Sequence, residues 1–595
     1  MSAAFRVLGP TTYAGSIDRL SPVVPSSTAV VPYQCGLLYF PGWSTPGGGP
    51  YPSAPWSVIP SDRIPLGLGA FDETNQTVVD TELTWMSQYG ITFVAIDWFH
   101  QFSGATLVPY LEHFINKVII SAVTKPKFCI QHANVTNAGS LNSTNWATIY
   151  NYWIANYFPD SNYYKINGYP VVVMNSVPSF QQRMGSNAAC KAALDAARAA
   201  AVTAGFPGII FMGGHEDAGA AWLATSTPAI QGWDGITGSN VFTTTQVGSS
   251  NPGIAATTYN DLDNAVFQGL VSGYQGFLYG WMNTSGITTV WPPLTAGFDD
   301  TPWDASTTLH GMPTSAEFGS HLTHAKTLID ANTTQTQKTF LLENATEFGE
   351  GSIMFPTSGN NGFDRLRQLN TKFSLNTSAV MVPNAFSFTD ITGATTSTVY
   401  TSNTITTAGI NVTGDYFVTG SATVSKNGGA FNANPGTFVV GDTFALRLTS
   451  AATGNLAVTG TLTLSGISDT YSVTTADNAP TDISLSSNVV LTTAGTNAVV
   501  GALSTTDADI GDIFTYSLVA GTGSTNNASF NISGANLRCN DPNALGAGTY
   551  SVRIQTSDSA SATFAKAFTI IVAAPSTGVG SGIGKLKIAI RIGVA

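Results

Sequence analysis

The chain has 595 residues, which is too long for one hydrophobic core, so we expect about two to four domains. Charged residues make up 10 % of the chain, the net charge is −12, and lysine and arginine form no cluster. This excludes a nucleic-acid binder that follows phosphates along a basic stripe. No run reaches the roughly 18 apolar residues of a membrane span, and the first residues lack the pattern of a cleaved signal peptide.

Strand-like and helix-like runs alternate through residues 34–380, which predicts a (β/α)8 barrel of the TIM type after an N-terminal arm at 1–33. Covering helices are predicted at 77–89, 107–122, 184–204, 257–271 and 315–331. The eight predicted strands are 35–40, 93–99, 127–133, 170–176, 208–214, 233–239, 275–282 and 338–345.

Beyond the barrel the pattern changes to short alternating segments separated by Gly, Asn and Asp, which predicts two β-sandwiches. The first is expected at 381–476 and the second at 477–573, so the fold class is α/β plus all-β. Residues 574–595 are a linker and a strand that we expect to dock on a neighbouring sheet edge. The four scattered cysteines are predicted to be buried free thiols.

The carboxyl ends of the predicted barrel strands are polar and aromatic, which suits a sugar site because aromatic rings cover the apolar faces of pyranoses. Trp43, Trp98 and Trp281 are the predicted sugar platforms. His215, Glu216 and Asp217 offer the alternative of a metal site, and Asp97 and His132 the alternative of structural polar residues. The candidate substrate-binding residues are Tyr39, Trp43, Asp97, Trp98, His100, His132, Asn134, Asn175, His215, Glu216, Asn240, Trp281 and Asn283.

Two glutamates, Glu347 and Glu350, follow the last predicted barrel strand. Residues at i and i+3 of a turning loop can place their carboxyl groups about 5–5.5 Å apart, the separation found in retaining glycosidases. One of the two needs a raised pKa to act as an acid, which a dehydrated pocket would supply. A solvated Gly-rich turn is the alternative interpretation of this segment.

The same residues carry a resemblance to a known group. The segments Tyr-Phe-Pro-Gly-Trp (39–43), Pro-Leu-Gly-Leu-Gly-Ala-Phe-Asp (65–72), Gly-Trp-Asp-Gly-Ile-Thr-Gly (232–238) and Pro-Leu-Thr-Ala-Gly-Phe-Asp-Asp-Thr-Pro-Trp (293–303) resemble the glycoside hydrolase family 99-like group. This group includes endo-α-mannosidases and WbsX-like proteins of polysaccharide gene clusters. The resemblance implies Glu347 as the base towards the sugar 2-hydroxyl and Glu350 as the acid, then the base towards water. Thr346 stands where an Asn is usual, and Phe355 where WbsX-like chains commonly have Glu.

The C-terminal segments carry resemblances of their own. Residues 385–476 resemble an immunoglobulin-like module of bacterial surface and phage tail proteins, and residues 480–573 resemble a cadherin-like module. The Asp-x-Asp of such modules often binds calcium, which implies Asp507 and Asp509 as ligands, with a plain acidic turn as the alternative. No other cofactor is expected.

These features support a carbohydrate-active protein, and three functions stay open. The first is a retaining endo-glycosidase acting on a surface polysaccharide, and the second is a virion protein that holds glycan without cutting it. The third is a glycosyltransferase of polysaccharide synthesis. The expected partners are a glycan and, through the C-terminal strand, other virion proteins or a second copy of the chain. The expected location is a virion or an extracellular surface reached without a cleaved signal peptide, and the cytoplasm before assembly.

Overall fold

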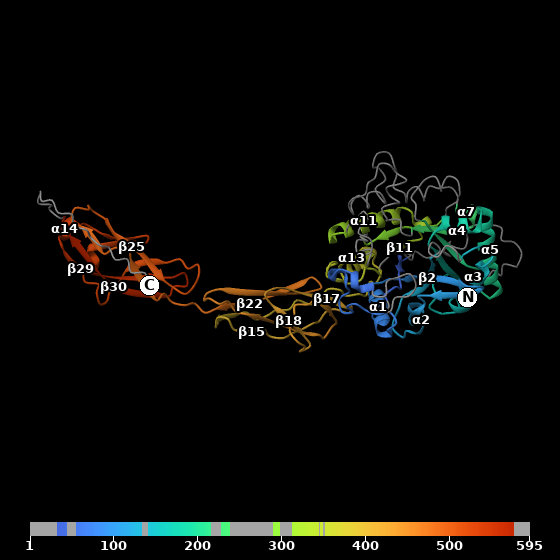
Figure 1. Ribbon diagram of the computed structural model, residues 1–595, viewed down its shortest axis with the longest axis horizontal. Coiled ribbons are helices and arrows are strands. Elements are labelled where there is room, and N and C mark those ends of the chain that lie inside the picture. The colour runs from blue at the N-terminus through green and yellow to red at the C-terminus, as the bar shows by residue number, and fades with distance from the viewer. Residues whose placement is uncertain are drawn as a thin grey trace, which may run out of the picture.

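The computed structural model describes residues 32–43, 55–133, 141–215, 228–238, 289–297, 312–343, 346–348 and 352–575, with the backbone alone at 55, 215, 228, 229, 343 and 347. A barrel of strands and helices lies at one end of the molecule, and two β-domains follow it in a row (Figure 1). This arrangement agrees with the predicted fold class.

The barrel is a ring of parallel strands whose order is β10-β11-β1-β2-β4-β6-β7-β8-β9. Nearly all residues of these strands are buried, as expected for a parallel sheet that side chains fill on one face and helices cover on the other. The strands are β1 (Gln34–Tyr39), β2 (Phe93–Ser103), β4 (Lys127–His132), β6 (Tyr169–Met174), β7 (Ile210–His215), β8 (Gly235–Gly238), β9 (Val290–Trp291), β10 (Pro293–Thr295) and β11 (Thr339–Glu343).

The ring closes through residues 290–295, which form one stretch of two short strands separated by Pro292. β9 pairs with β8, and β10 pairs with β11, so this stretch occupies the position between them. Proline cannot donate to a ladder, which explains the break, although the Pro292 carbonyl still accepts from Leu341 N at 3.0 Å. The predicted strand at 275–282 lies outside the described residues, and within the described residues 290–295 occupies the seventh position of the ring.

Helices cover the outside of the ring, and sequence-encoded caps set several of their ends. Asn75 caps α1, Ser186 caps α5, and Thr314 with Glu317 forms a reciprocal capping box at α11. The predicted helix at 107–122 is shorter than expected, because residues 106–110 form β3 (Thr106–Tyr110), a hairpin partner of β2. The helices are α1 (Gln76–Gln88), α2 (His113–Ile120), α3 (Trp146–Asn156), α4 (Val177–Met184), α5 (Asn187–Thr203), α7 (Pro228–Gln231), α11 (Ser315–Ala331), α12 (Thr333–Thr336) and α13 (Asp364–Phe373).

Two β-domains follow the barrel, and each consists of two facing sheets. The first domain has sheets β14-β22-β21-β17-β19 and β15-β20-β16, with β18 also on β20. Its strands are β14 (Ile391–Ala394), β15 (Val399–Thr401), β16 (Ile405–Thr406), β17 (Gly414–Gly420), β18 (Thr423–Lys426), β19 (Gly436–Phe438), β20 (Thr443–Thr449), β21 (Ala457–Leu464) and β22 (Ile467–Thr475).

The second domain has sheets β23-β25-β28-β27 and β24-β30-β29-β26 around its own core. Its strands are β23 (Asp482–Leu485), β24 (Val489–Leu491), β25 (Ala498–Thr506), β26 (Thr515–Leu518), β27 (Phe530–Ser533), β28 (Asn536–Cys539), β29 (Gly548–Ser557) and β30 (Thr563–Ala573). The predicted docking strand at 585–592 lies outside the described residues, as does nearly all of the predicted N-terminal arm.

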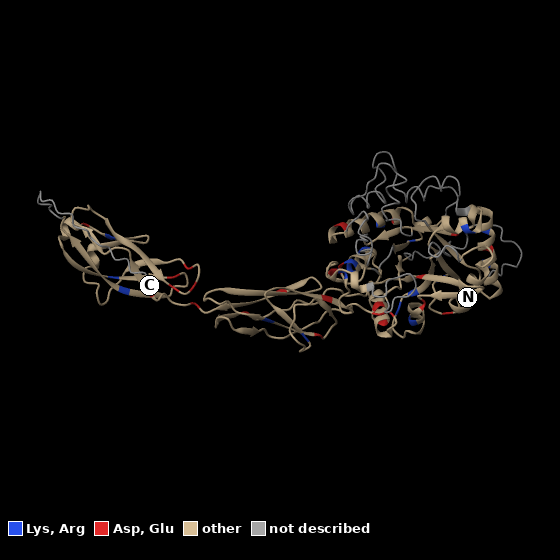
Figure 2. Ribbon diagram, viewed as in Figure 1, with Lys and Arg blue, Asp and Glu red and all other residues tan. Residues whose placement is uncertain are grey.

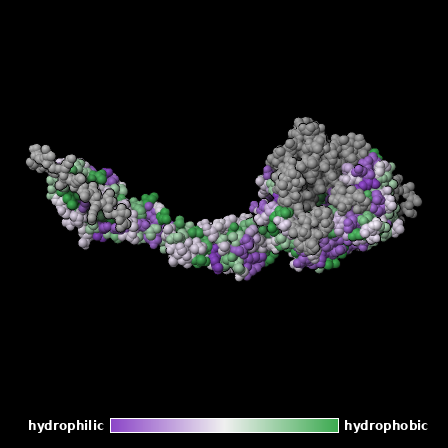
Figure 3. Space-filling model, in the orientation of Figure 1, coloured by the Kyte–Doolittle hydropathy of each residue, from purple (hydrophilic) through white to green (hydrophobic). Residues whose placement is uncertain are grey.

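The surface carries few charges, and acidic residues gather where the two β-domains meet (Figure 2). Apolar and polar residues are interspersed over the visible face, without one large apolar patch (Figure 3). In the part of the chain that the structure describes, none of the helices has the length and apolar character needed to cross a bilayer. All four cysteines are buried and free, which confirms that prediction.

The barrel and the first β-domain share one continuous hydrophobic core, and a buried ion pair lies at their junction. The Asp415 carboxylate is 1 % exposed and accepts from the backbone N–H of Phe363 at 2.6 Å and from Arg367 Nη1 at 2.5 Å. Tyr89 at the end of α1 donates to the Thr413 carbonyl at 2.7 Å. The first β-domain is therefore a fixed extension of the barrel.

We expect Asp415→Ala to lower the free energy of unfolding by about 3–5 kcal/mol, because it leaves the Arg367 charge and the Phe363 N–H without their acceptor in a buried junction. Urea unfolding followed by tryptophan fluorescence measures this change. The control is Asp482→Ala, which removes an exposed partner of Lys566 and should change the midpoint little. Equal midpoints for the two variants would contradict the assignment of Asp415 as the residue that joins the first β-domain to the barrel.

Candidate functional site

The carboxyl ends of neighbouring barrel strands bring several predicted site residues together. In the parallel register, Asp97 of β2 lies opposite Gln131 of β4, and Trp98 lies opposite His132. Asn175 follows β6 and accepts from Gln131 Nε2 at 3.4 Å. The sequence therefore placed these polar residues correctly on one end of the ring, where barrel enzymes build their sites.

The imidazoles of His100 and His132 form a buried pair at this end. His132 Nε2 and His100 Nδ1 are 3.3 Å apart, and the His100 ring stacks on Trp98 with 5.2 Å between ring centroids. Burial lowers the pKa of His100 to about 4, with a further contribution from the Arg183 charge. Burial first, and then His100 and Arg183, lower the pKa of His132 well below its usual value. Both rings are neutral at pH 7, so they offer hydrogen bonds and no charge.

The aromatic residues predicted to contact sugar are buried in the described structure. Trp43 is fully buried, with Trp56 at 4.5 Å and Phe348 at 5.0 Å between ring centroids, and Trp98 is 1 % exposed. Tyr39 is fully buried, and its hydroxyl lies between two glutamates. Protein side chains therefore cover these rings, so a direct contact with a sugar would require neighbouring residues to move.

The segment that carries Glu347 is held against the end of β1. It forms the short hairpin of β12 (Thr346–Glu347) with β13 (Ser352–Ile353). The Thr346 hydroxyl is buried and accepts from Phe40 N at 3.0 Å, while the Thr346 carbonyl accepts from Trp43 Nε1 at 2.8 Å. On the other side of Glu347, the Phe348 carbonyl accepts from Arg63 Nη1 at 3.4 Å. The residues before and after Glu347 are thus both anchored.

Several predicted site residues lie outside the described residues and stay predictions. They are Asn134, Glu216, Asn240, Trp281, Asn283 and Glu350, together with the side chains of His215 and Glu347. The backbone of His215 ends β7, and that of Glu347 lies in β12.

Two buried acids in this region were missed by the sequence analysis. Glu73 precedes α1 and Glu82 lies within it, and both are 0 % exposed. Burial raises the pKa of each carboxyl group, and the pKa of Glu82 is raised further by the neighbouring Glu73 charge. Glu82 lies on the helix face that also carries Val79 and Met86, and an acid on an apolar helix face was the signal that could have pointed to it.

Phe355, where the resemblance implied a departure from Glu, is fully buried, and its ring lies 5.8 Å from that of Trp85. At this position the chain therefore uses an apolar packing contact.

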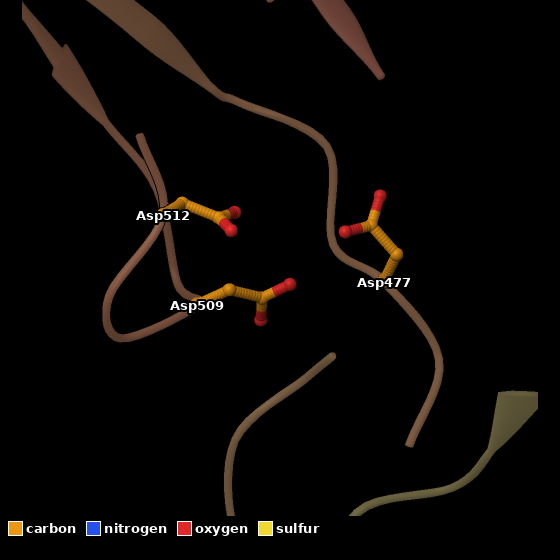
Figure 4. Close-up of side chains that lie close together, drawn as sticks. All are labelled: Asp477, Asp509 and Asp512. Atoms are coloured by element: carbon orange, nitrogen blue, oxygen red, sulfur yellow. The ribbon is translucent and has the colours of Figure 1, made fainter. Parts of the chain in front are cut away.

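A second candidate site lies at the joint of the two β-domains. Carboxylate oxygens of Asp477, Asp509 and Asp512 lie within 4.8 Å of one another (Figure 4). Those of Asp507, Asp512 and Asp558 also lie within 4.8 Å of one another. The sequence analysis named Asp507 and Asp509. Asp512 lies three residues after Asp509, Asp477 opens the second predicted sandwich, and Asp558 is distant in sequence and carried no local signal.

The acidic cluster contains carboxylate oxygens that lack a hydrogen-bond partner. Asp558 is 6 % exposed, and the buried Oδ2 atoms of Asp507, Asp512 and Asp558 have no donor. Asp509 accepts twice from Asn478, at 2.8 Å from its backbone N and at 2.7 Å from its side chain. Hard oxygens gathered without donors are the ligand set that calcium prefers, so these residues fit that ion.

The family comparison defines a carbohydrate-active class of protein. Residues 60–366 match the family described as Glycosyltransferase WbsX. This match covers just over half of the chain, and the protein belongs to the WbsX family. The resemblance on which the sequence analysis relied is thereby confirmed.

Solved structures with similar folds include two of a GH99 endo-alpha-mannosidase from Bacteroides thetaiotaomicron. One, in complex with BIS-TRIS-propane, is 13 % identical with a TM-score of 0.40, and the match covers 58 % of this chain and 97 % of that one. The other is 11 % identical with a TM-score of 0.38, covering 58 % and 99 %. Human protocadherin-24 EC1-2 is 16 % identical with a TM-score of 0.16, covering 26 % and 82 %. A search of curated proteins gives no match.

We expect Thr346→Val to lower the free energy of unfolding by about 1–3 kcal/mol, because it leaves the Phe40 N–H buried without its acceptor. Val has nearly the shape of Thr, so the change isolates the hydroxyl. The control is Thr327→Val on the exposed face of α11, where about 0.5 kcal/mol or less is expected. Chemical denaturation measures both, and a Thr346→Val midpoint equal to that of the control would refute this role of the hydroxyl.

Proposed function

We propose that the protein is a retaining endo-glycosidase that cleaves a surface polysaccharide with Glu347 and Glu350. The observation that carries the proposal is the Glu-x-x-Glu sequence on a segment tied to the end of β1 in a WbsX-family barrel. The polar residues at the ends of β2, β4 and β6 surround the same end of the ring and would bind sugar hydroxyls.

In this proposal the reaction has two steps. Glu350 protonates the glycosidic oxygen while Glu347 removes the proton of the sugar 2-hydroxyl, so that O2 attacks C1, the bond to the leaving group breaks and a 1,2-anhydro sugar forms. Water then attacks C1, Glu350 takes its proton, and Glu347 returns a proton to O2 as the O2–C1 bond breaks. The two inversions at C1 give retention of configuration.

The direct test incubates the purified chain with mannose-rich and bacterial capsular polysaccharides and follows chain length. We expect Glu347→Gln and Glu350→Gln each to lower the rate by about 10²–10⁴-fold, because each removes a proton-transfer group. The matched control is Glu317→Gln in the exposed cap of α11, which should keep the wild-type rate. A cleaved substrate with the same rate for wild type and Glu350→Gln would remove Glu350 as the acid.

Two other results would point to the alternative functions. Binding on a glycan array without hydrolysis after long incubation, with the chain present in purified particles, would support a glycan-holding virion protein. Transfer of sugar from a nucleotide sugar to an acceptor, without hydrolysis, would support the glycosyltransferase activity.

We propose separately that the acidic cluster at the joint binds calcium and stiffens the connection between the two β-domains. The support is the set of donor-free buried oxygens together with the approach of Asp477 and Asp509 from the two sides of the joint. Calcium would offset the mutual repulsion of these five carboxylates, which no lysine or arginine ion pair among the described residues compensates.

We expect calcium to raise the stability of the second β-domain by about 2.7 kcal/mol when free calcium is 100 times its dissociation constant. Thermal unfolding with and without a chelator measures this effect. Asp558→Asn should weaken the response, and the control Asp482→Asn, which lies outside the cluster, should preserve it. Equal melting curves with calcium and with chelator in the wild-type chain would reject the site.

A further inference from the structure

Five buried residues and the half-buried His113 are linked by hydrogen bonds beside the barrel mouth. The Tyr39 hydroxyl, at the end of β1, lies 2.7 Å from Glu73 Oε1 and 2.9 Å from Glu82 Oε2. The other oxygen of Glu73 is 3.1 Å from Trp43 N and 3.2 Å from His113 Nε2. The Trp43 indole then donates to the carbonyl of Thr346, next to Glu347.

The number of O–H protons along this hydrogen-bonded chain limits how many of its two carboxyl groups can be ionised. A phenol has one O–H, so Tyr39 can donate to only one of the two carboxyl groups that contact it. The second contact is a hydrogen bond only when that carboxyl group is protonated and donates to the phenol oxygen. With both contacts as full hydrogen bonds, one of the two glutamates is a carboxylic acid in the folded protein.

The surroundings of the two groups show which one carries the proton. Glu73 faces three donors, namely Tyr39 Oη, Trp43 N and His113 Nε2, which is the environment of a carboxylate. Glu82 contacts only Tyr39, and its other oxygen is buried without a partner. A buried carboxylate with one unpartnered oxygen would be costly, whereas a neutral acid tolerates this environment.

We propose that Glu73 is a positioning residue for the Glu347 segment, and that a protonated Glu82 holds it in place through Tyr39. In this arrangement Glu82 donates to Tyr39, Tyr39 donates to Glu73, and the Glu73 carboxylate fixes the backbone of Trp43. The Trp43 indole in turn fixes the strand that carries Glu347. The part of the proposal that concerns catalysis rests on the proposed function, and the protonation of Glu82 does not.

The raised pKa of Glu82, caused first by burial and then by Glu73, supports the proton count. The charged and titratable groups that face it are Glu73 and Tyr39, with His113 beyond Glu73. An acid that is protonated when folded and ionised when unfolded makes folding take up a proton. Stability is then lost as pH rises from the unfolded pKa towards the folded one.

The first experiment replaces Glu82 by Gln, a neutral group that can still donate to Tyr39, and measures unfolding between about pH 5 and pH 8. The folding equilibrium constant of Glu82→Gln, divided by that of wild type, should rise about tenfold per pH unit. This holds over the pH range in which Glu82 is protonated in the folded state and ionised in the unfolded state. Glu73→Gln weakens the contacts of Glu73 with its three hydrogen-bond donors. This variant should therefore be less stable than Glu82→Gln at every pH. A pH-independent difference between Glu82→Gln and wild type would overturn the assignment of the proton.

The second experiment tests positioning by comparing the same substitution at two neighbouring indoles. Trp43→Phe removes the bond to the Thr346 carbonyl, whereas Trp56→Phe removes an equivalent bond to the Phe71 carbonyl in the same aromatic cluster. On a cleaved polysaccharide, Trp43→Phe should lower kcat by up to about 100-fold with little change in KM, and Trp56→Phe should lower it far less. Equal kcat values for the two variants would overturn the positioning role.

The outcomes separate this inference from the proposed function. If the wild-type chain cleaves no polysaccharide, the proposed function and the catalytic part of the inference fail together, and the pH series still decides whether Glu82 carries the proton. If the wild type is active and Glu350→Gln is not, a normal kcat in Trp43→Phe overturns the inference alone.

Discussion

The hydrogen bonds between the end of β1 and Thr346 are the constraint on which the candidate active site depends. A short segment between two strands has little packing of its own, and its backbone polar groups must find partners if they are buried. Here Phe40, Trp43 and Thr346 satisfy one another across about 300 residues of sequence, which joins the first and last strands of the barrel. The candidate base Glu347 is thus attached beside the point where β1 and β11 pair.

The polar groups next to this contact connect it to α1 and α2. Burying Glu73 and Glu82 in an apolar region is unfavourable unless each carboxyl group finds a donor or keeps a proton. The Tyr39 hydroxyl contacts both carboxyl groups, donating to Glu73 and accepting from the protonated Glu82. Together with His113, these groups connect α1 and α2 to the barrel mouth. Asp415 fixes the first β-domain to α13, and the bond from Tyr89 to the Thr413 carbonyl fixes it to the C-terminal end of α1. Hydrogen bonds therefore connect the candidate site, through α1, to the junction between the barrel and the first β-domain.

Most barrel strands and several helices were predicted from the periodicity of apolar residues, and the predictions that failed did so for physical reasons. Seven of the barrel strands and the helices α1, α5 and α11 were recognisable because continuous apolar runs and capped amphipathic runs differ in period. The stretch 290–295 was not recognised as a strand, because Pro292 breaks its ladder and its pairing is divided between two neighbours. The segment 106–110 looked helical because its apolar residues suit either period, and its hairpin pairing to β2 decided the outcome.

The candidate sites show the same division between local and distant information. Local sequence pointed to His100, His132, Asp97 and Asn175, since strand ends of a parallel barrel meet at one edge. The buried state of Trp43 and Trp98 depends on residues from other segments, as does the approach of Asp558 to Asp507. Contacts of this kind leave no pattern in the sequence.

The configuration of the first product tests the central claim most directly. Proton NMR of a polysaccharide during early cleavage by the wild-type chain would show the anomer formed before mutarotation. Two successive displacements at C1, by O2 and then by water with Glu347 and Glu350 transferring the protons, predict retention of the anomeric configuration, and inversion would contradict this account of the site.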